Sequence, residues 1–257
     1  MIKYGIKLWT NNKGLFRKAI NLYKEKKFDF IELYNNSSHA HDYKALAKLK
    51  NAPVTIHNTN NQGFHKFIIK KKQLSVWNKT VELADFFNSP YIIVHPGQNH
   101  TFKTFRENLK KINDKRILIE NMPGLDIFGQ PMYGQKINEL KKINKTNNIC
   151  FDFEKAIKAA CYQNINYKKF IRDCITELNP FYFHISGGDK NNPVDEHKNL
   201  WESNFDFKWI KNILNKKTLE KNIFLVFESP KTTDNLKNDI KNINYFKKLN
   251  HRYAYEK

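Results

Sequence analysis

Eight short apolar runs recur along the chain, and this repeating pattern constrains the fold more than any other feature of the sequence. Each run is rich in β-branched and aromatic residues and is followed by a longer amphipathic segment. Nearly continuous hydrophobicity over so short a length is typical of parallel strands that are buried on both faces. The runs span residues 2–8, 28–34, 53–57, 91–95, 116–120, 149–153, 181–185 and 223–228.

The segments between these runs show the spacing of helices that bury one face. Apolar residues recur three or four positions apart, which predicts helices that pack on a sheet. Eight strands, each followed by a helix, is the number that closes a barrel. We therefore predict one (β/α)8 TIM barrel formed by a single domain over residues 1–257. The clearest stripes are Leu15/Ala19/Leu22/Tyr23, Leu74/Trp77/Val81/Ala84, Phe170/Cys174/Leu178 and Ile240/Ile243/Phe246.

The sequence shows no recognisable targeting signal, and its few unpaired cysteines indicate a reducing compartment. No stretch approaches 18 uncharged apolar residues, and the first ten residues, MIKYGIKLWT, lack the regions of a signal peptide. Cys150, Cys161 and Cys174 fit neither a paired framework nor a CxxC site, so we expect reduced thiols in or near the core. We expect a cytoplasmic protein with no membrane partner.

The charge of the chain is strongly positive. Lys and Arg number 45 against 25 Asp and Glu, which gives a net charge of +20. Such a field attracts polyanions and speeds their encounter. The alternative explanation of the charge is compositional drift, because the chain is rich in Lys, Asn and Ile. Such drift should raise the Glu content together with the Lys content, and the Glu content has not risen. The charge therefore favours DNA or another phosphorylated partner.

Metal-ligating residue types end or nearly end six consecutive runs. In a barrel, the carboxyl ends of the strands and the loops after them face one common mouth. Each residue alone has an ordinary explanation, as a buried histidine or a helix N-cap. To account for the whole set, such an explanation would have to apply independently at six strands. Burying so many carboxylates without cations is also unfavourable. The candidate ligands are His57, His95, Glu120, Asp152, His184 and Glu228, with Asp195 and His197 in the loop after the seventh run.

The ligand types narrow the choice of metal. Oxygen and imidazole nitrogen suit Zn²⁺, Mn²⁺ or Fe²⁺, and imidazole argues against Mg²⁺ alone. Glu120, Asp152, Asp195 and Glu228 carry four negative charges, which two divalent ions would neutralise. We expect two divalent ions, Zn²⁺ before Mn²⁺.

Six motifs, in this order and at these intervals, resemble the endonuclease IV group. That group is the apurinic/apyrimidinic endonuclease branch of the xylose isomerase-like barrels, and the resemblance covers the third to the eighth predicted strand, about two-thirds of the chain. It implies cleavage of DNA at abasic sites. The motifs are IVHPG (93–97), LIENMPG (118–124), FDFEKA (151–156), FHISGG (183–188), DEH (195–197) and FESP (227–230).

The resemblance also implies a distribution of the ligands over metals. His57 and His95 would hold one metal, and Glu120 would bridge it to a second. The remaining ligands of the second metal would be Asp152, His184 and Glu228. Asp195 and His197 match two of the three ligands of the family's third zinc.

Three departures from the family pattern bear on this assignment. Lys155 stands where the family has the remaining histidine of the third zinc site, so two metals are better supported than three. Its ammonium could fill the vacated position and pair with Asp195, or Glu154 could substitute as a ligand. Where the family inserts bulky residues into the duplex, HNTNNQG (57–63) carries Asn58, Asn60 and Asn61. In LWES (200–203), Trp201 either reshapes the pocket or packs in the core.

Two activities remain open on the sequence, and a third possibility is a barrel that binds metal or nucleic acid without turnover. The first activity is hydrolysis of DNA at abasic sites, with Glu120, Glu228 and Lys155 as catalytic candidates. The second is a sugar or sugar-phosphate isomerase or epimerase with one metal, which needs a smaller ligand set. That set is Glu120, Asp152, His184 and Glu228. Four further residues near the mouth receive no role from the sequence, namely Lys7, Trp9, Glu32 and Tyr34.

Overall fold

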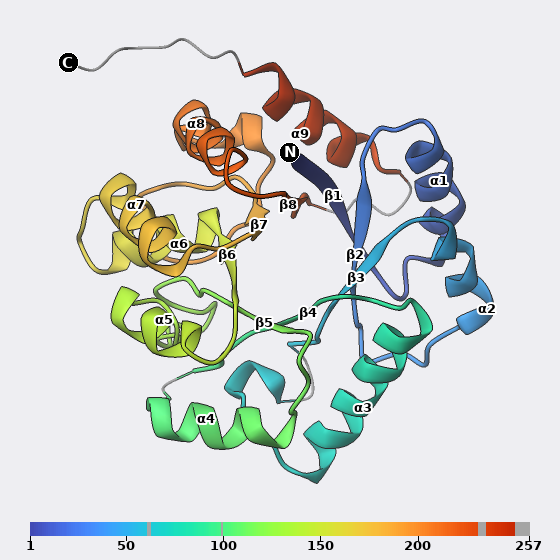
Figure 1. Ribbon diagram of the computed structural model, residues 1–257, viewed down its shortest axis with the longest axis horizontal. Coiled ribbons are helices and arrows are strands. Elements are labelled where there is room, and N and C mark those ends of the chain that lie inside the picture. The colour runs from blue at the N-terminus through green and yellow to red at the C-terminus, as the bar shows by residue number, and fades with distance from the viewer. Residues whose placement is uncertain (61–62, 99, 231–234, 250–257) are drawn as a thin grey trace.

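The computed structural model describes residues 1–60, 63–98, 100–230 and 235–249, and in them eight parallel strands close into a barrel (Figure 1). Neighbouring strands follow the order of the chain, and β1 pairs with β8 to close the ring. The predicted (β/α)8 fold is confirmed, and each strand lies within two residues of its predicted run. The strands are β1 Ile2–Trp9, β2 Phe30–Tyr34, β3 Val54–His57, β4 Ile92–Val94, β5 Ile117–Glu120, β6 Ile149–Asp152, β7 Tyr182–Ile185 and β8 Ile223–Phe227.

Helices form an outer ring around the strands (Figure 1). The four predicted helical stripes lie in α1, α3, α7 and α9 and bury their apolar residues against the barrel. Four connections of the described residues hold more than a single helix. A 3-10 helix accompanies α2 after β2, α3 after β3 and α8 after β7, and both α6 and α7 follow β6. The helices are α1 Lys13–Lys24, α2 Tyr43–Leu46, α3 Lys71–Phe86, α4 Phe102–Lys111, α5 Ile137–Asn144, α6 Phe153–Tyr162, α7 Tyr167–Leu178, α8 Phe207–Lys217 and α9 Lys237–Lys248.

The inside of the barrel changes from apolar to polar along the strands. A buried cluster inside the ring, separate from the larger core under the helices, forms an apolar plug. Side chains two positions apart on a strand point to the same face. The residues two positions further along therefore also point inward, one layer closer to the mouth, and they are the charged and imidazole residues of the strand ends. The plug consists of Phe30, Ile93, Leu118, Cys150, Tyr182 and Val226.

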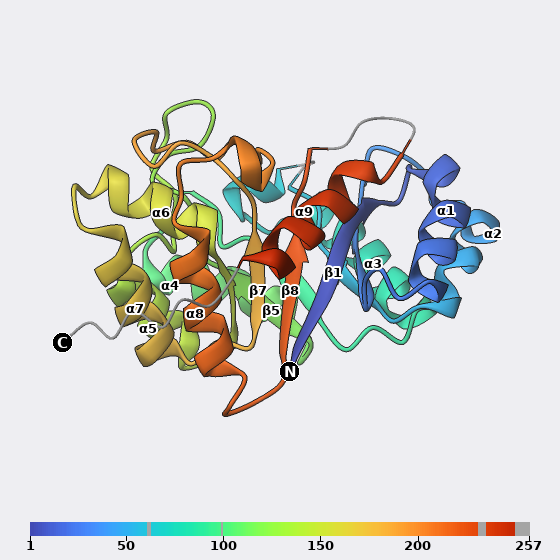
Figure 2. The same ribbon diagram turned by 90° about the horizontal axis from the view of Figure 1, so that it is seen from above.

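The carboxyl ends of the strands meet on one side of the molecule. Figure 2 shows the strands rising from the N-terminus towards the loops along the upper edge. These loops and strand ends surround a cavity of about 510 Å³. Among the helices of the described residues, none is long and apolar enough to cross a membrane.

Candidate metal centre

The carboxylate of Glu120 lies at the middle of the polar layer. It ends β5, is fully buried, and meets side chains from β3, from the residue after β4, from β7 and from α6. Its Oε2 lies 3.3 Å from Nε2 of His57 and 2.6 Å from Nε2 of His95. Its Oε1 lies 2.8 Å from Nδ1 of His184 and 2.6 Å from Nζ of Lys155. The two oxygens of one carboxylate therefore face two different groups of residues.

The first group is formed by His57, His95 and Glu120, whose ligand-type atoms lie within 4.8 Å of one another. Nδ1 of His57 lies 2.7 Å from the carbonyl oxygen of Asn58, and a carbonyl can only accept, so Nδ1 carries a proton. Burial, followed by the charge of Lys7, lowers the pKa of His57, so the ring is neutral and Nε2 presents a lone pair. That lone pair faces the Glu120 carboxylate, an arrangement that a cation between them would stabilise.

The second group combines four buried side chains, Glu120, Asp152, His184 and Glu228, whose ligand-type atoms again lie within 4.8 Å of one another. Oδ1 of Asp152 caps α6 by accepting from the Lys155 amide at 2.9 Å, while its Oδ2 is buried without a hydrogen bond. Burial, together with Glu228 and Glu120 and against Lys155, raises the pKa of Asp152 to about 7. Burial and the neighbouring carboxylates therefore outweigh the attraction of the Lys155 ammonium at Asp152, and a further cation would favour its ionised form.

Lys155 lies inside the second group. Its Nζ contacts Glu120 at 2.6 Å and Asp152 at 3.4 Å. Burial alone would lower the pKa of Lys155, but Glu120 and Asp152 raise it well above the usual value, so the side chain is an ammonium. The sequence left open an ion pair between Lys155 and Asp195. Among the described residues Lys155 is paired with Glu120 and Asp152 instead, and Asp195 acts on it only from further away, by raising its pKa.

A third group lies beside the second, at the loop after β7. His197 places Nε2 3.1 Å from Asp195 and Nδ1 3.2 Å from Glu228. Glu154 comes within 4.8 Å of Asp195 and His197, as the sequence allowed. Its carboxylate is engaged elsewhere, since it accepts from the amides of Glu196 at 2.8 Å and His197 at 3.1 Å. Glu154 therefore orders this loop.

The eight candidate ligands thus converge at one mouth, and the donor set fits divalent ions. Several of their buried polar atoms make no hydrogen bond, including Oδ2 of Asp152, Oδ1 of Asp195 and Oε2 of Glu228. Burial lowers the pKa of His95 to about 4, against the attraction of Glu120, so its imidazole is in the ligating form. The residues present could hold divalent cations, most readily in the first and second groups.

Sequence comparison agrees with this architecture. The sequence model of the xylose isomerase-like TIM barrels matches residues 20–249. The chain belongs to this family. A search of curated proteins finds no match.

Solved structures similar to this xylose isomerase-like barrel include enzymes of two kinds. Endonuclease IV from Thermus thermophilus has a TM-score of 0.72 and 18% identity, covering 96% of this chain and 98% of that one. A D-tagatose 3-epimerase-like protein has a TM-score of 0.67 and 17% identity, covering 96% of each chain. A xylose isomerase domain protein from Planctomyces limnophilus has a TM-score of 0.63 and 10% identity, with 96% of each chain covered. Identities this low establish the shared fold alone.

The structure also adds two charged residues to the site of this barrel. Lys7 and Glu32 are opposite each other in the register of β1 and β2, and their side chains meet at 3.3 Å. Lys7 also forms an ion pair with Glu228. The signal in the sequence is a lysine in the first strand and a glutamate in the second, each between apolar neighbours. It could not be read without knowing that both side chains point into the ring.

The cavity at the mouth is lined by charged, polar and aromatic side chains. The candidate ligands His57, His95, Asp195, His197 and Glu228 line it. So do residues outside that set: Lys7, Trp9, Tyr34, Asn36, Asn60, Lys155, Ser229 and Pro230.

Three further expectations can be compared with the structure. Trp201 is not among the residues that line the cavity, and Nζ of Lys241 lies 3.8 Å from its ring centroid, so it packs against α9. Asn58 is buried and accepts from Thr80 at 2.7 Å, which makes it a structural residue. Asn61 and Gln62 lie outside the described residues.

The cysteines are free, as predicted. Cys150 nevertheless lies close to Glu120 and His184, which the sequence did not indicate. Burial raises the pKa of Cys150 to about 12, so the thiol stays protonated. In the metal-free protein Cys150 is thus a neutral member of the apolar plug.

Proposed function

We propose that the chain is a metal-dependent phosphodiester hydrolase that cleaves DNA at apurinic/apyrimidinic sites. One observation carries the proposal: Glu120 is shared by two ligand groups, one with His57 and His95 and one with Asp152, His184 and Glu228. A site for a single metal does not require the first group. The motif resemblance, the similar fold of endonuclease IV and the net charge of +20 support the same reading.

Each side chain then has a definable task. Two bound divalent ions would lower the pKa of a water molecule and offset the negative charge of a phosphate. Glu228 lines the cavity, and its Oε2 lies 3.2 Å from Nδ1 of His197. Its carboxylate is placed to accept the proton of that water. Lys155 reaches the same cavity and offers an ammonium to a phosphate oxygen.

The second candidate is a sugar or sugar-phosphate isomerase or epimerase. It is favoured by Lys155, which lines the cavity where a small phosphorylated substrate would bind, and by the fold of the D-tagatose 3-epimerase-like protein. Such an enzyme would use the second ligand group alone, and its carboxylates would move a proton at carbon. His57 and His95 would then have no role in the chemistry.

One experiment separates these activities. Zinc-loaded and manganese-loaded protein is incubated with a duplex that carries one abasic analogue, and separately with ketoses and their phosphates in D₂O. The proposal expects incision at the abasic site and no deuterium incorporation. Deuterium incorporation into a sugar, with no incision at any salt concentration, would refute it.

A variant makes the test sharper. His57→Gln removes a ligand-type side chain from the first group and leaves the second intact. The hydrolase reading expects the loss of most incision activity, whereas an isomerase would keep its rate. His39→Gln makes the same substitution at an exposed histidine outside the cavity and both ligand groups, and it is the matched control.

A further inference from the structure

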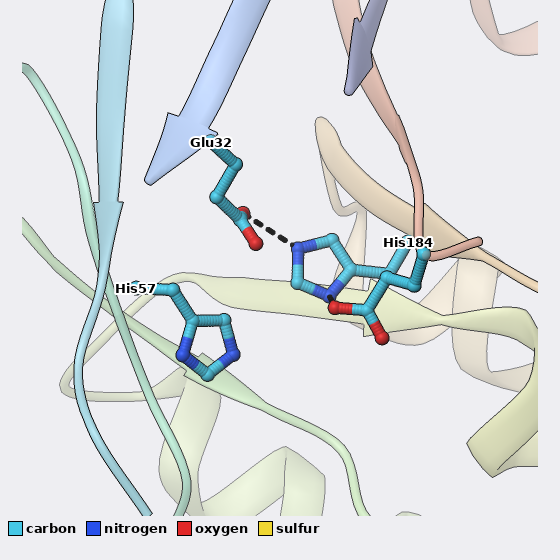
Figure 3. Close-up of side chains that lie close together, drawn as sticks. Glu32, His57 and His184 are labelled. Atoms are coloured by element: carbon cyan, nitrogen blue, oxygen red, sulfur yellow. Dashed lines mark hydrogen bonds and ion pairs between the residues drawn. The ribbon is translucent and has the colours of Figure 1, made fainter. Parts of the chain in front are cut away.

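Glu32 is a buried carboxylate that holds the outer nitrogen of His184. It comes from the middle of β2, has no exposed surface, and places Oε2 2.8 Å from Nε2 of His184 (Figure 3). The other ring nitrogen, Nδ1, lies 2.8 Å from Glu120 and 3.1 Å from Glu228. One nitrogen thus faces β2, and the other faces the second ligand group.

This arrangement decides which nitrogen can ligate. An ionised carboxylate can only accept, so Nε2 of His184 must carry the proton of the hydrogen bond to Glu32. Nδ1 faces Glu120 and Glu228, so by the same rule it also carries a proton while no cation is bound. A cation beside these two carboxylates would displace that proton, and Nδ1 would then be the ligating nitrogen. His57 follows the same rule, with its outer nitrogen bonded to the Asn58 carbonyl. In both rings an acceptor outside the ligand groups fixes the tautomer.

Glu32 itself is occupied by other partners. The hydroxyl of Tyr182 donates to its Oε2 at 2.9 Å, and the ammonium of Lys7 lies 3.3 Å from its Oε1. Glu32, His57, His184 and Glu228 do lie close enough to surround an ion. The Lys7 ammonium already places a positive charge between Glu32 and Glu228. A metal ion would therefore have to displace an ion-paired lysine there.

We propose that Glu32 is a positioning residue that orients His184 and fixes its tautomer for metal binding, and that Lys7 keeps Glu32 in place as its counter-ion. The pair comes from β1 and β2, outside the six strands whose ends carry the candidate ligands. The inference rests on the metal centre of the proposed function and does not depend on the substrate.

The test is a zinc titration of metal-free wild type and Glu32→Gln, followed by calorimetry and by ¹⁵N NMR of the histidine rings. The amide keeps the size of Glu32 but is a weaker acceptor. We expect the zinc affinity of one site to fall by about 10- to 100-fold while the other site is unchanged. The Nε2–H resonance of His184 should lie strongly downfield in wild type and move upfield in the variant.

Tyr182→Phe is the matched control. It removes a partner from the same oxygen of Glu32 and leaves the contact with His184 intact. The proposal expects zinc affinities close to those of wild type for this variant. An equal loss of affinity in both variants would assign the effect to general disruption of the network and overturn the inference.

Unchanged zinc affinity and an unchanged His184 resonance in folded Glu32→Gln would also overturn it. If Glu32→Gln does not fold because Lys7 loses its counter-ion, the double variant Lys7→Met/Glu32→Gln removes both charges and should show the same loss of affinity. None of these measurements uses a substrate. Weakened zinc binding in a protein that cuts no abasic duplex would refute the proposed function alone, and the reverse result would refute this inference alone.

Discussion

Replacing Lys155 with methionine should strongly destabilise the metal-free protein. The side chain of Lys155 is only 3% exposed. Its ammonium lies 2.6 Å from Glu120 and 3.4 Å from Asp152. Breaking a buried ion pair by removing one partner costs about 3–5 kcal/mol, because the other charge stays buried without compensation. In a chain of 257 residues, each kcal/mol lowers Tm by about 2–4 °C. The expected decrease is therefore about 6–20 °C.

Lys169→Met is the matched control for this prediction. Lys169 also forms an ion pair at 2.6 Å, with Asp173, but 77% of its side chain is exposed. Exposed pairs contribute at most about 1 kcal/mol, so its Tm should fall by less than about 4 °C. Both variants are measured by circular dichroism in thermal and urea unfolding, after exhaustive chelation, at pH 7.

Zinc provides a second readout on the same variants. A cation bound to the native state offsets the carboxylates left by Lys155→Met, so zinc should raise Tm more in this variant than in wild type. Equal stability of metal-free Lys155→Met and Lys169→Met would refute the reasoning. It would mean that the Lys155 ammonium does not neutralise the second ligand group.

Four further perturbations test the same geometry. Lys155→His should gain about one equivalent of zinc by elemental analysis, and an unchanged count would contradict the reading of Lys155 as a replacement for a ligand. The pKa of His95 is lowered to about 4 in the fold, so metal-free protein should lose stability as pH falls from about 6.5 to 4, and His95→Gln should reduce this slope in urea titrations. Gly97→Ala should cost at least about 1 kcal/mol, because Gly97 has φ +90° and a Cβ would lie 2.5 Å from Phe67; an unchanged Tm would contradict this. Duplex affinity should fall about a thousandfold between about 50 and 200 mM salt if about six phosphates are contacted, and a flat salt dependence would exclude backbone recognition.

The fold and the candidate ligands could be predicted because both follow from strand periodicity. A run such as YIIVH (91–95) is apolar until its last residue, and in a closed ring that last residue must lie at the mouth. The alternation of side chains then places His95 one layer above Ile93 and Glu120 one layer above Leu118. Neither inference needs distances between strands.

Contacts between side chains could not be predicted in the same way. The sequence places Lys155 one turn into a helix, but only the orientation of α6 shows that its ammonium reaches Glu120 and not Asp195. The contact of Glu32 could not be predicted either, because its partner His184 lies 152 residues further along the chain. The sequence left two placements open for Trp201, in the pocket or in the core. Only its contact with Lys241 on α9 decides between them.

Anomalous scattering at the zinc edge tests most directly whether cations bind around Glu120. In crystals grown with zinc, we predict two anomalous peaks on either side of the Glu120 carboxylate, one beside His57 and His95 and the other beside His184 and Glu228. The absence of any peak within coordinating distance of Glu120, in crystals that diffract well enough to show its side chain, would contradict a metal centre at this position.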